Sequence, residues 1–258
     1  MKNIIKEYTL YIVCVLFIGF IYFKPMIKRL IYPYIYGQKT DEVLEISKND
    51  YFEDVSLDAF VFKRKGKSYL LEPKTIYAVT GRVGIVDNYD TLFEQIYRAK
   101  FQGDYMTLVP RDVFLVIGSM AEDGIFQKFL FEHEERMGRV LCAGVKYKRS
   151  FMPSFLSAKQ ALKNEEKYRS CQRYINQNEL NNYHPIPASE NINKALMTLK
   201  KGDEVYMEGY LVDVPTLGLK TGTRKNQYHE NIKIGAFSPG MCFVLYTTKV
   251  ITRGRVYE

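Results

Sequence analysis

The first pattern along the chain is an uncharged, mostly apolar run of sixteen residues, Tyr8–Phe23, which lies between Lys6 and Lys24. A helix rises about 1.5 Å per residue, so the run covers about 24 Å of a hydrocarbon core that is about 30 Å thick. The flanking lysines can extend to the membrane surface. We therefore expect a membrane anchor over residues 1–29. A cleaved signal peptide and a fully buried core helix are the alternatives, although no small-residue cleavage site follows the run.

Beyond the anchor, the pattern of apolar positions changes to that of short strands and amphipathic helices. Residues 30–40 predict either a connector at the membrane surface or a first strand. Two short strands surround the turn Lys65-Gly66-Lys67, and alternation then continues through residues 76–83. Periodicity predicts the remaining elements. The helices are expected over 90–100, 124–137, 155–175 and 190–201, and the strands over 105–109, 113–117, 139–147, 203–214 and 241–252.

The helix over 190–201 has the clearest boundaries. Ser189 is a good N-cap residue, and Gly202 stands where a helix stop with positive φ is expected. Its inward face is expected to hold four apolar residues: Ile192, Ala195, Leu196 and Leu199.

These elements predict an α+β fold, in which a transmembrane helix precedes a mostly antiparallel, β-rich domain. Gly81 and Gly209 stand inside predicted strands, where glycine often marks a bend in a small barrel. The C-terminal part, 200–258, is therefore expected to be barrel-like, of the OB or SH3 kind. We expect two units, an anchor over 1–29 and a soluble α+β domain over 30–258, with a sub-boundary near 176–188.

Charge limits the classes of partner. The chain has 258 residues and a net charge of +8, but its first 40 residues hold six basic residues and one acidic residue. The body is therefore nearly balanced, which argues against nucleic acid as a partner. Lysines flank the apolar run on both sides, so the positive-inside rule leaves open which side of the membrane holds the domain.

The cysteines and histidines predict no metal site and no cofactor. The four cysteines, Cys14, Cys142, Cys171 and Cys242, are widely spaced and form no C-x-x-C motif. We expect small buried apolar side chains rather than a disulfide framework. The stretch that begins at His133 starts like a zinc-protease helix, but Met137 occupies the position of the second histidine.

No catalytic residue can be assigned from a motif. Ser119 lies in I-G-S-M-A, which is not the G-x-S-x-G of a nucleophile elbow. Cys242, His184 and Asp203 form one conceivable trio, with a buried cysteine and a loop histidine as the alternative. The loop over 217–229 has the glycines and cations of a phosphate loop without its spacing. Three basic residues of this loop, together with His184 from outside it, are candidates for contact with an anion or a partner: His184, Lys220, Arg224 and Lys225.

Three short stretches carry a family resemblance. These are NYHPIPA at 182–188, KGDEV at 201–205 and EGYLV at 208–212, followed by a late Cys242. Together they resemble a group of uncharacterised bacterial single-pass membrane proteins with no known activity. This chain lacks the paired serines and the aspartate of the group's last loop, and Phe243 stands in place of a glutamate. The resemblance bears on placement and fold, not on activity.

The sequence as a whole predicts a single-pass protein of the bacterial inner membrane with a structural or protein-interaction role. Its expected partners are the lipid bilayer, through Tyr8–Phe23, and another membrane or envelope protein. The alternative is a membrane-tethered hydrolase with a site around His184, Asp203 and the 217–229 loop. The lack of catalytic motifs favours the non-enzymatic role.

Overall fold

The structure is a computed structural model that describes residues 26–28, 30–47, 50–89, 104–134, 137–145, 158–222 and 242–258. The predicted anchor over Tyr8–Phe23 and the predicted helix over 90–100 lie outside these residues. Within them, no helix combines the length and the apolar character that a membrane crossing needs. The predicted connector over 30–40 is helical as far as Tyr36 and then forms the short strand β1.

The described chain is mostly β-structure. Its strands are β1 (Gln38–Lys39), β2 (Tyr51–Asp54), β3 (Phe60–Arg64), β4 (Lys67–Asn88), β5 (Arg111–Val116), β6 (Phe129–Glu134), β7 (Met137–Cys142), β8 (Leu180–Pro187), β9 (Glu204–Asp213), β10 (Cys242–Thr252) and β11 (Arg255–Tyr257). Its helices are α3 (Asp123–Phe126), α4 (Ala158–Gln172) and α5 (Glu190–Thr198), with 3-10 turns η1 (Gly118–Ala121), η2 (Gln177–Glu179) and η3 (Pro215–Leu217).

Five strands close into a barrel. Strand β4 pairs with β9 and with β5, β5 pairs with β8, β8 pairs with β10, and β10 returns to β9. Every pair in this ring is antiparallel except β8 with β10. The mostly antiparallel α+β fold is therefore confirmed. The expected barrel within 200–258 is wrong in extent, because β4 and β5 precede residues 176–188 and β8 lies within them.

Two local features allow the ring to close. Strand β4 carries register shifts between Pro73 and Thr75 and between Val83 and Ile85. Such irregularities bend a strand and let it serve two neighbours. At Gly209, a β-carbon would lie 2.0 Å from the carbonyl oxygen of Tyr246, so the close approach of β9 and β10 requires glycine.

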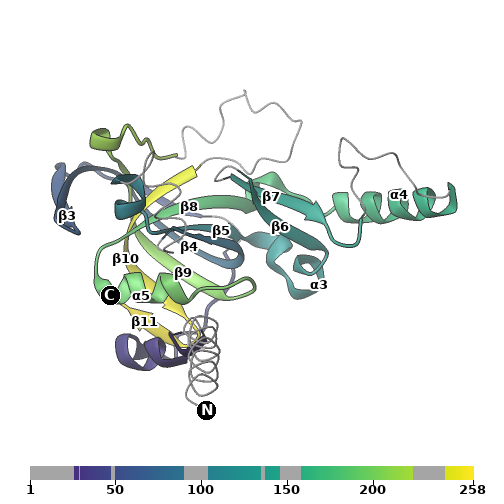
Figure 1. Ribbon diagram of the computed structural model, residues 1–258, viewed down its shortest axis with the longest axis horizontal. Coiled ribbons are helices and arrows are strands. Elements are labelled where there is room, and N and C mark those ends of the chain that lie inside the picture. Colours follow the sequence, from purple (N-terminus) through teal and green to yellow (C-terminus); the bar gives the residue numbers. More distant parts are fainter. Residues whose placement is uncertain are drawn as a thin grey trace, which may run out of the picture.

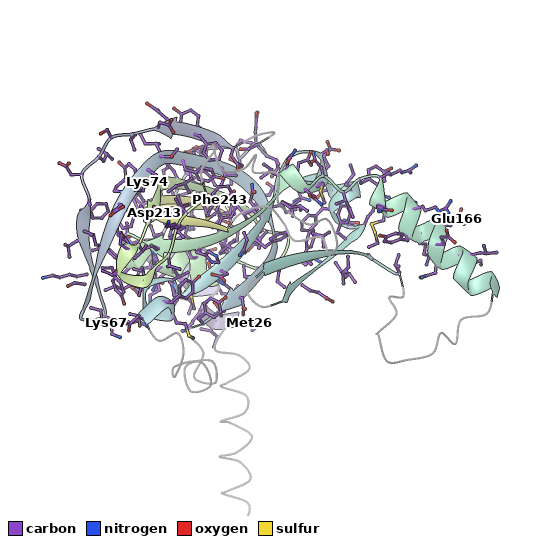
Figure 2. All side chains as sticks on the ribbon, turned by 90° about the horizontal axis from the view of Figure 1, so that it is seen from above. Met26, Lys67, Lys74, Glu166, Asp213 and Phe243 are labelled. Carbon is purple, nitrogen blue, oxygen red and sulfur yellow. A yellow bond between two sulfur atoms is a disulfide. The ribbon has the colours of Figure 1, made fainter. Side chains whose placement is uncertain are left out.

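Aromatic rings and one helix fill the barrel. The ring of Phe243 stacks on both Tyr77 and Tyr183, with centroids 5.5 and 5.4 Å away, and Figure 2 shows Phe243 inside the barrel. Helix α5 lies between β8 and β9 along the chain and adds its apolar face to the same core. That face is the predicted one, and the Ser189 side chain caps the helix by accepting from the Ile192 N–H. The helix ends at Thr198, three residues earlier than predicted.

Two further apolar clusters cover the outside of the barrel. The β3–β4 hairpin and residues 104–109 cover the outer face of β8, β9 and β10, and the β6–β7 hairpin covers the outer face of β5. Figure 1 shows β3 on one side of the barrel and β6, β7 and α4 on the other. Helix α4 extends away from the barrel, with Glu166 near its exposed middle (Figure 2).

Some predicted elements are wrong. The predicted helix over 124–137 is the single turn α3 followed by strand β6, in which Phe129 and Phe131 are buried while Leu130 is 43% exposed. This alternation is that of a strand. Residues 104–108 are helical rather than extended.

The cysteine expectation is also corrected. Cys142 at the end of β7 and Cys171 in α4 form a disulfide, with their Cα atoms 5.8 Å apart. The fold brings together two residues that are 29 positions apart in the sequence. Both side chains pack in the outer cluster under the β6–β7 hairpin, so the bridge fixes α4 to that hairpin.

Candidate functional site

A buried histidine–carboxylate pair lies on the outer face of the barrel. Strands β5 and β8 pair Val113 with Tyr183, and the next residues in this register are Asp112 and His184. Val113 and Tyr183 belong to the barrel interior, so strand alternation places Asp112 and His184 on the outside. The covering segments nevertheless keep both from solvent, since Asp112 is fully buried and His184 nearly so.

Three side chains hydrogen-bond to the Asp112 carboxylate. The His184 Nδ1 atom lies 2.6 Å from Asp112 Oδ1, and the Tyr105 hydroxyl donates to the same oxygen at 3.2 Å. The Tyr89 hydroxyl donates to Oδ2. Tyr105 also lies 2.9 Å from His184 Nδ1, and the two rings meet edge to face. Residues from three other parts of the chain therefore converge on one carboxylate.

This arrangement fixes the tautomer of the histidine. A carboxylate accepts hydrogen bonds, so Nδ1 carries the proton that faces Asp112. The neutral imidazole then has its lone pair on Nε2, the atom that can accept a proton. In hydrolases where a carboxylate orients a histidine base, the carboxylate also stabilises the imidazolium that forms. The pair can therefore perform general acid–base chemistry.

The predicted trio is only partly assembled. Asp203 precedes β9, whose Val205 pairs with Thr252, whereas His184 pairs with Val244 near the other end of β10. Several residues of extended strand, at about 3.3 Å each, separate Asp203 from the histidine. Asp203 instead accepts a hydrogen bond from the Lys200 N–H at 2.9 Å.

Residue 242 lies near the histidine in the sheet. In the parallel pairing of β8 with β10, Cys242 is opposite Asn182 and Val244 is opposite His184. Cys242 is thus two positions along the neighbouring strand from the partner of the histidine.

The start of the 217–229 loop also approaches this part of the barrel. The Thr221 hydroxyl accepts a hydrogen bond from the Val244 N–H at 3.1 Å, and the Thr221 N–H donates to Asp213 at 2.8 Å. Lys220, one of the four candidate contact residues, precedes Thr221 and is exposed. Arg224 and Lys225 lie outside the described residues.

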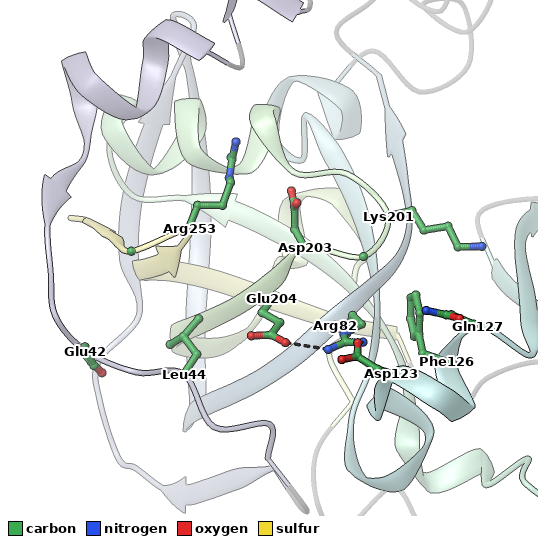
Figure 3. Close-up of a pocket in the computed structure, with 12 residues that line it drawn as sticks. Glu42, Leu44, Arg82, Asp123, Phe126, Gln127, Lys201, Asp203, Glu204 and Arg253 are labelled. Atoms are coloured by element: carbon green, nitrogen blue, oxygen red, sulfur yellow. Dashed lines mark hydrogen bonds and ion pairs between the residues drawn. The ribbon is translucent and has the colours of Figure 1, made fainter.

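A concave region lies away from the histidine, around Arg82 (Figure 3). It has a volume of about 740 Å³ and includes Asp203 and Lys201 in its lining. The Arg82 guanidinium bonds Glu204 at 2.8 Å and also contacts Asp123. Because these charges neutralise one another, the region offers no single-sign surface to a ligand.

A third polar cluster lies inside the barrel. Asp50 accepts a hydrogen bond from the Asn181 side chain at 3.0 Å, near the hydroxyl pair of Tyr77 and Tyr183. Burial raises the pKa of Asp50 from 3.8 to about 6, partly opposed by hydrogen bonds from Tyr77 and Asn181. Burial also raises the pKa of both tyrosines well above the ordinary value, so their hydroxyls stay neutral.

Sequence reasoning selected His184 but missed its partners. Asp112 follows a proline and an arginine in a segment predicted as a strand only from residue 113, and nothing local connects it to a histidine 72 positions later. Nothing in the sequence distinguishes Tyr89 and Tyr105 from the other tyrosines of the chain. In the described part of the chain, no group of three or more histidine, cysteine or acidic residues is placed to hold a metal ion.

No family model, curated protein or solved structure matches the chain.

Proposed function

We propose that the protein is a membrane-tethered hydrolase in which Asp112 orients His184 as the general base. The observation that carries this proposal is the 2.6 Å contact between a fully buried carboxylate and a histidine ring nitrogen, on a face with apolar clusters on both sides. Withdrawing such a pair from water costs free energy. Buried titratable groups with specific charge partners gather at functional sites.

The strand order supports the same face as a binding surface. Numbered along the chain, the ring strands β4, β5, β8, β9 and β10 are joined in the order 1-2-3-5-4, with a parallel pair between the third and fifth strands. Helix α5 connects the third strand to the fourth. We propose that this barrel is of the OB type, whose ligands bind across the second and third strands. His184 and Asp112 lie on those two strands.

The proposed location rests on two features. The uncharged run Tyr8–Phe23 is the proposed anchor in the bacterial inner membrane, in keeping with the resemblance to single-pass membrane proteins. The Cys142–Cys171 disulfide favours the oxidising side, because disulfides persist outside the cytoplasm. We therefore propose that the barrel faces away from the cytoplasm.

The test is hydrolysis of p-nitrophenyl esters of increasing acyl length, and of a p-nitroanilide, by the full chain in a mild non-ionic detergent. His184→Asn should lower the rate by about 10²–10⁴-fold, which is the usual contribution of a general base. Equal rates for the wild type and His184→Asn, or no hydrolysis of any compound in the series, would contradict the proposal.

Two tyrosine variants provide a matched comparison. Tyr105→Phe removes the hydroxyl that donates to Asp112. Tyr183→Phe removes a hydroxyl in the barrel interior, at the position next to His184 in β8. Losing one hydrogen bond of about 1 kcal/mol should slow hydrolysis roughly fivefold in the first variant. The second variant should hydrolyse at the wild-type rate.

A second candidate function is the interaction role expected from the sequence. The helical segment over 30–36 exposes apolar side chains to solvent, among them Ile31, Ile35 and Tyr34, which is 77% exposed. An exposed apolar patch of this kind marks a surface that contacts a protein or a membrane. We propose another envelope protein as its partner in this case.

Photo-crosslinking in membranes tests the interaction role. A photoreactive residue at Tyr34 should give one protein adduct, and the same residue at the exposed Glu166 of α4 should not. Adducts with lipid alone at position 34 would identify a membrane contact and contradict a protein partner.

A further inference from the structure

We infer that the helical segment over 30–36 lies on the surface of the lipid bilayer, with its exposed apolar face among the lipid headgroups. This inference rests on the membrane anchor of the proposed function and adds a second membrane contact to it. The packing of the segment, its distance along the chain from the anchor and the cations beside it favour lipid over the protein partner of the second candidate function.

The segment has two sides, of which the barrel covers only one. On the covered side, Pro33 is buried and Tyr36 packs against the barrel core. The other side holds exposed and largely apolar side chains: Leu30, Ile31, Tyr34 and Ile35. These positions are three or four residues apart, which places them on one face of a helix. They form a continuous apolar face that points away from the barrel.

The segment is fixed to the barrel, so it cannot turn this face inward. Strand β1, which follows it directly, pairs with β11. The Arg255 guanidinium donates to the Gly37 carbonyl at 2.8 Å. A β-carbon at Gly37 would lie 2.6 Å from the Tyr257 ring, so the chain packs closely against β11 at this point. Figure 1 shows the purple helical segment beside β11.

The proposed anchor brings lipid within reach of this face. The uncharged run ends at Phe23, and only Lys24 and Pro25 separate it from Met26, the first described residue. An extended chain advances at most about 3.6 Å per residue, so Met26 lies within ~11 Å of the end of the run. With the run in the bilayer, the helical residues begin at the membrane surface. Lipid is then beside the apolar face in any membrane, whereas a protein would have to be recruited to it.

The cations beside the face suit lipid headgroups. The Lys28 Nζ atom is 5.8 Å from the centroid of the Tyr32 ring, and Lys28 is exposed. The Arg255 guanidinium carbon is 4.5 Å from the centroid of the Tyr34 ring. Tyrosine rings are enriched at the membrane interface, and cations close to it are attracted to anionic headgroups. The face therefore combines apolar side chains for the acyl boundary with cations for the phosphates.

Fluorescence quenching in vesicles tests the contact. The full chain, with a fluorescent amino acid at position 34, is reconstituted into vesicles of equal parts of phosphatidylcholine and phosphatidylglycerol. Some of the lipid carries a nitroxide, either near the headgroup or deep in the acyl chain, and the ratio of the two quenching efficiencies gives the depth. Position 34 should lie about 5–10 Å into the headgroup and acyl boundary, as interfacial helices do. No other protein is present, so lipid is the only partner that can produce this result.

Position 162 in α4 is the matched control. Leu162 is also apolar and is 68% exposed, and Figure 2 shows Glu166 of the same helix well away from Met26. The fluorescent amino acid at position 162 should be quenched by iodide in the water and not by the nitroxide lipids.

Charged substitutions distinguish a bound face from mere proximity to the membrane. Ile31→Glu combined with Ile35→Glu places two carboxylates on the apolar face and should abolish lipid quenching at position 34. Both isoleucines are exposed, so the fold should be retained, which circular dichroism checks. Leu162→Glu should leave the quenching at position 34 unchanged. Equal quenching in the double variant and the wild type would overturn the inference, because the apolar face would not be what holds the segment to lipid.

The same vesicles separate this inference from the proposed function. If the full chain does not remain with the vesicles in alkaline carbonate, the anchor is refuted and the inference fails with it. If it remains, but position 34 is quenched by iodide and not by the nitroxide lipids, the anchor stands and the inference is overturned. Quenching requires no catalytic activity, so hydrolysis of p-nitrophenyl esters by these vesicles tests the hydrolase independently.

Discussion

Replacing Asp50 with asparagine should stabilise the folded protein at neutral pH. Asp50 lies against Asn181 and the Tyr77–Tyr183 hydroxyl pair, and burial raises its pKa to about 6. At pH 7 the carboxylate is therefore ionised in surroundings that favour its neutral form. Asparagine is neutral at every pH, has nearly the same shape, and keeps an oxygen to accept the hydrogen bond from Asn181.

The magnitude follows from the difference between the folded and unfolded pKa. The unfolded value is 3.8 and the folded value about 6. At 1.36 kcal/mol per unit, the charged form costs about 3 kcal/mol. Because the folded pKa is the higher one, protonation stabilises the native state. That stability is complete below pH 3.8 and is lost as the pH rises through 6.

Guanidinium unfolding of the full chain in detergent, from pH 4 to pH 7.5, measures the effect. The free energy of unfolding of Asp50→Asn minus that of the wild type should rise by about 2.4 kcal/mol across this range, because pH 4 does not yet reach the full effect. Asp58→Asn, which changes an exposed carboxylate between β2 and β3, is the control and should give a flat difference. A flat difference for Asp50→Asn as well would refute the reasoning, since a constant offset reports only altered hydrogen bonding.

Three further outcomes test the barrel, the bridge and the anchor. Gly202→Ala should destabilise the protein by about 1 kcal/mol, because Gly202 has a φ of +86° but lies in open space. Gly209→Ala should destabilise it by much more, because a β-carbon at position 209 would lie 2.0 Å from a carbonyl oxygen. Thermal melts compare them, and equal losses contradict the strand register. Reducing the Cys142–Cys171 bond should lower the unfolding free energy by about 3–4 kcal/mol, and a melt that is insensitive to reductant argues against the bridge. Deleting residues 1–29 should leave a soluble, folded body by circular dichroism, and a fragment that aggregates in every mild buffer places the apolar run in the core.

Elements that depend on local signals were predicted well. The hairpin around Lys65–Gly66 follows from a turn between two alternating runs, and the start of α5 follows from the Ser189 cap. Strand β9 follows from strict alternation over residues that are buried on one face. Gly202 has the predicted positive φ, although it lies in the turn after the helix rather than at its cap. Each of these features is decided within a few residues of chain.

Strand β8 shows what local signals cannot predict. Its sequence, LNNYHPIP, contains residues that are depleted in strands, and prolines cannot donate to a sheet. In the structure, β8 pairs with β5 only as far as Tyr183. Pro185 and Pro187 therefore lie where β8 needs no N–H to donate to β5, and the β10 pairing holds the segment extended. The strand depends on partners more than 50 residues away in the sequence.

The same dependence on distant partners explains why only part of the candidate site could be predicted from the sequence. His184 could be selected because histidine is rare in this chain, but its role depends on Asp112, which only the β5–β8 pairing brings to it.

On the same outer face, Phe114 and Leu180 pack on one side of the His184–Asp112 pair, and Ile186 and Val244 pack on the other. Apolar side chains would therefore suit the packing at these two positions and would avoid the cost of burying a charge. Because the barrel core lies on the opposite side of these strands, the fold does not require the pair. The acid–base chemistry of the proposed function does require it.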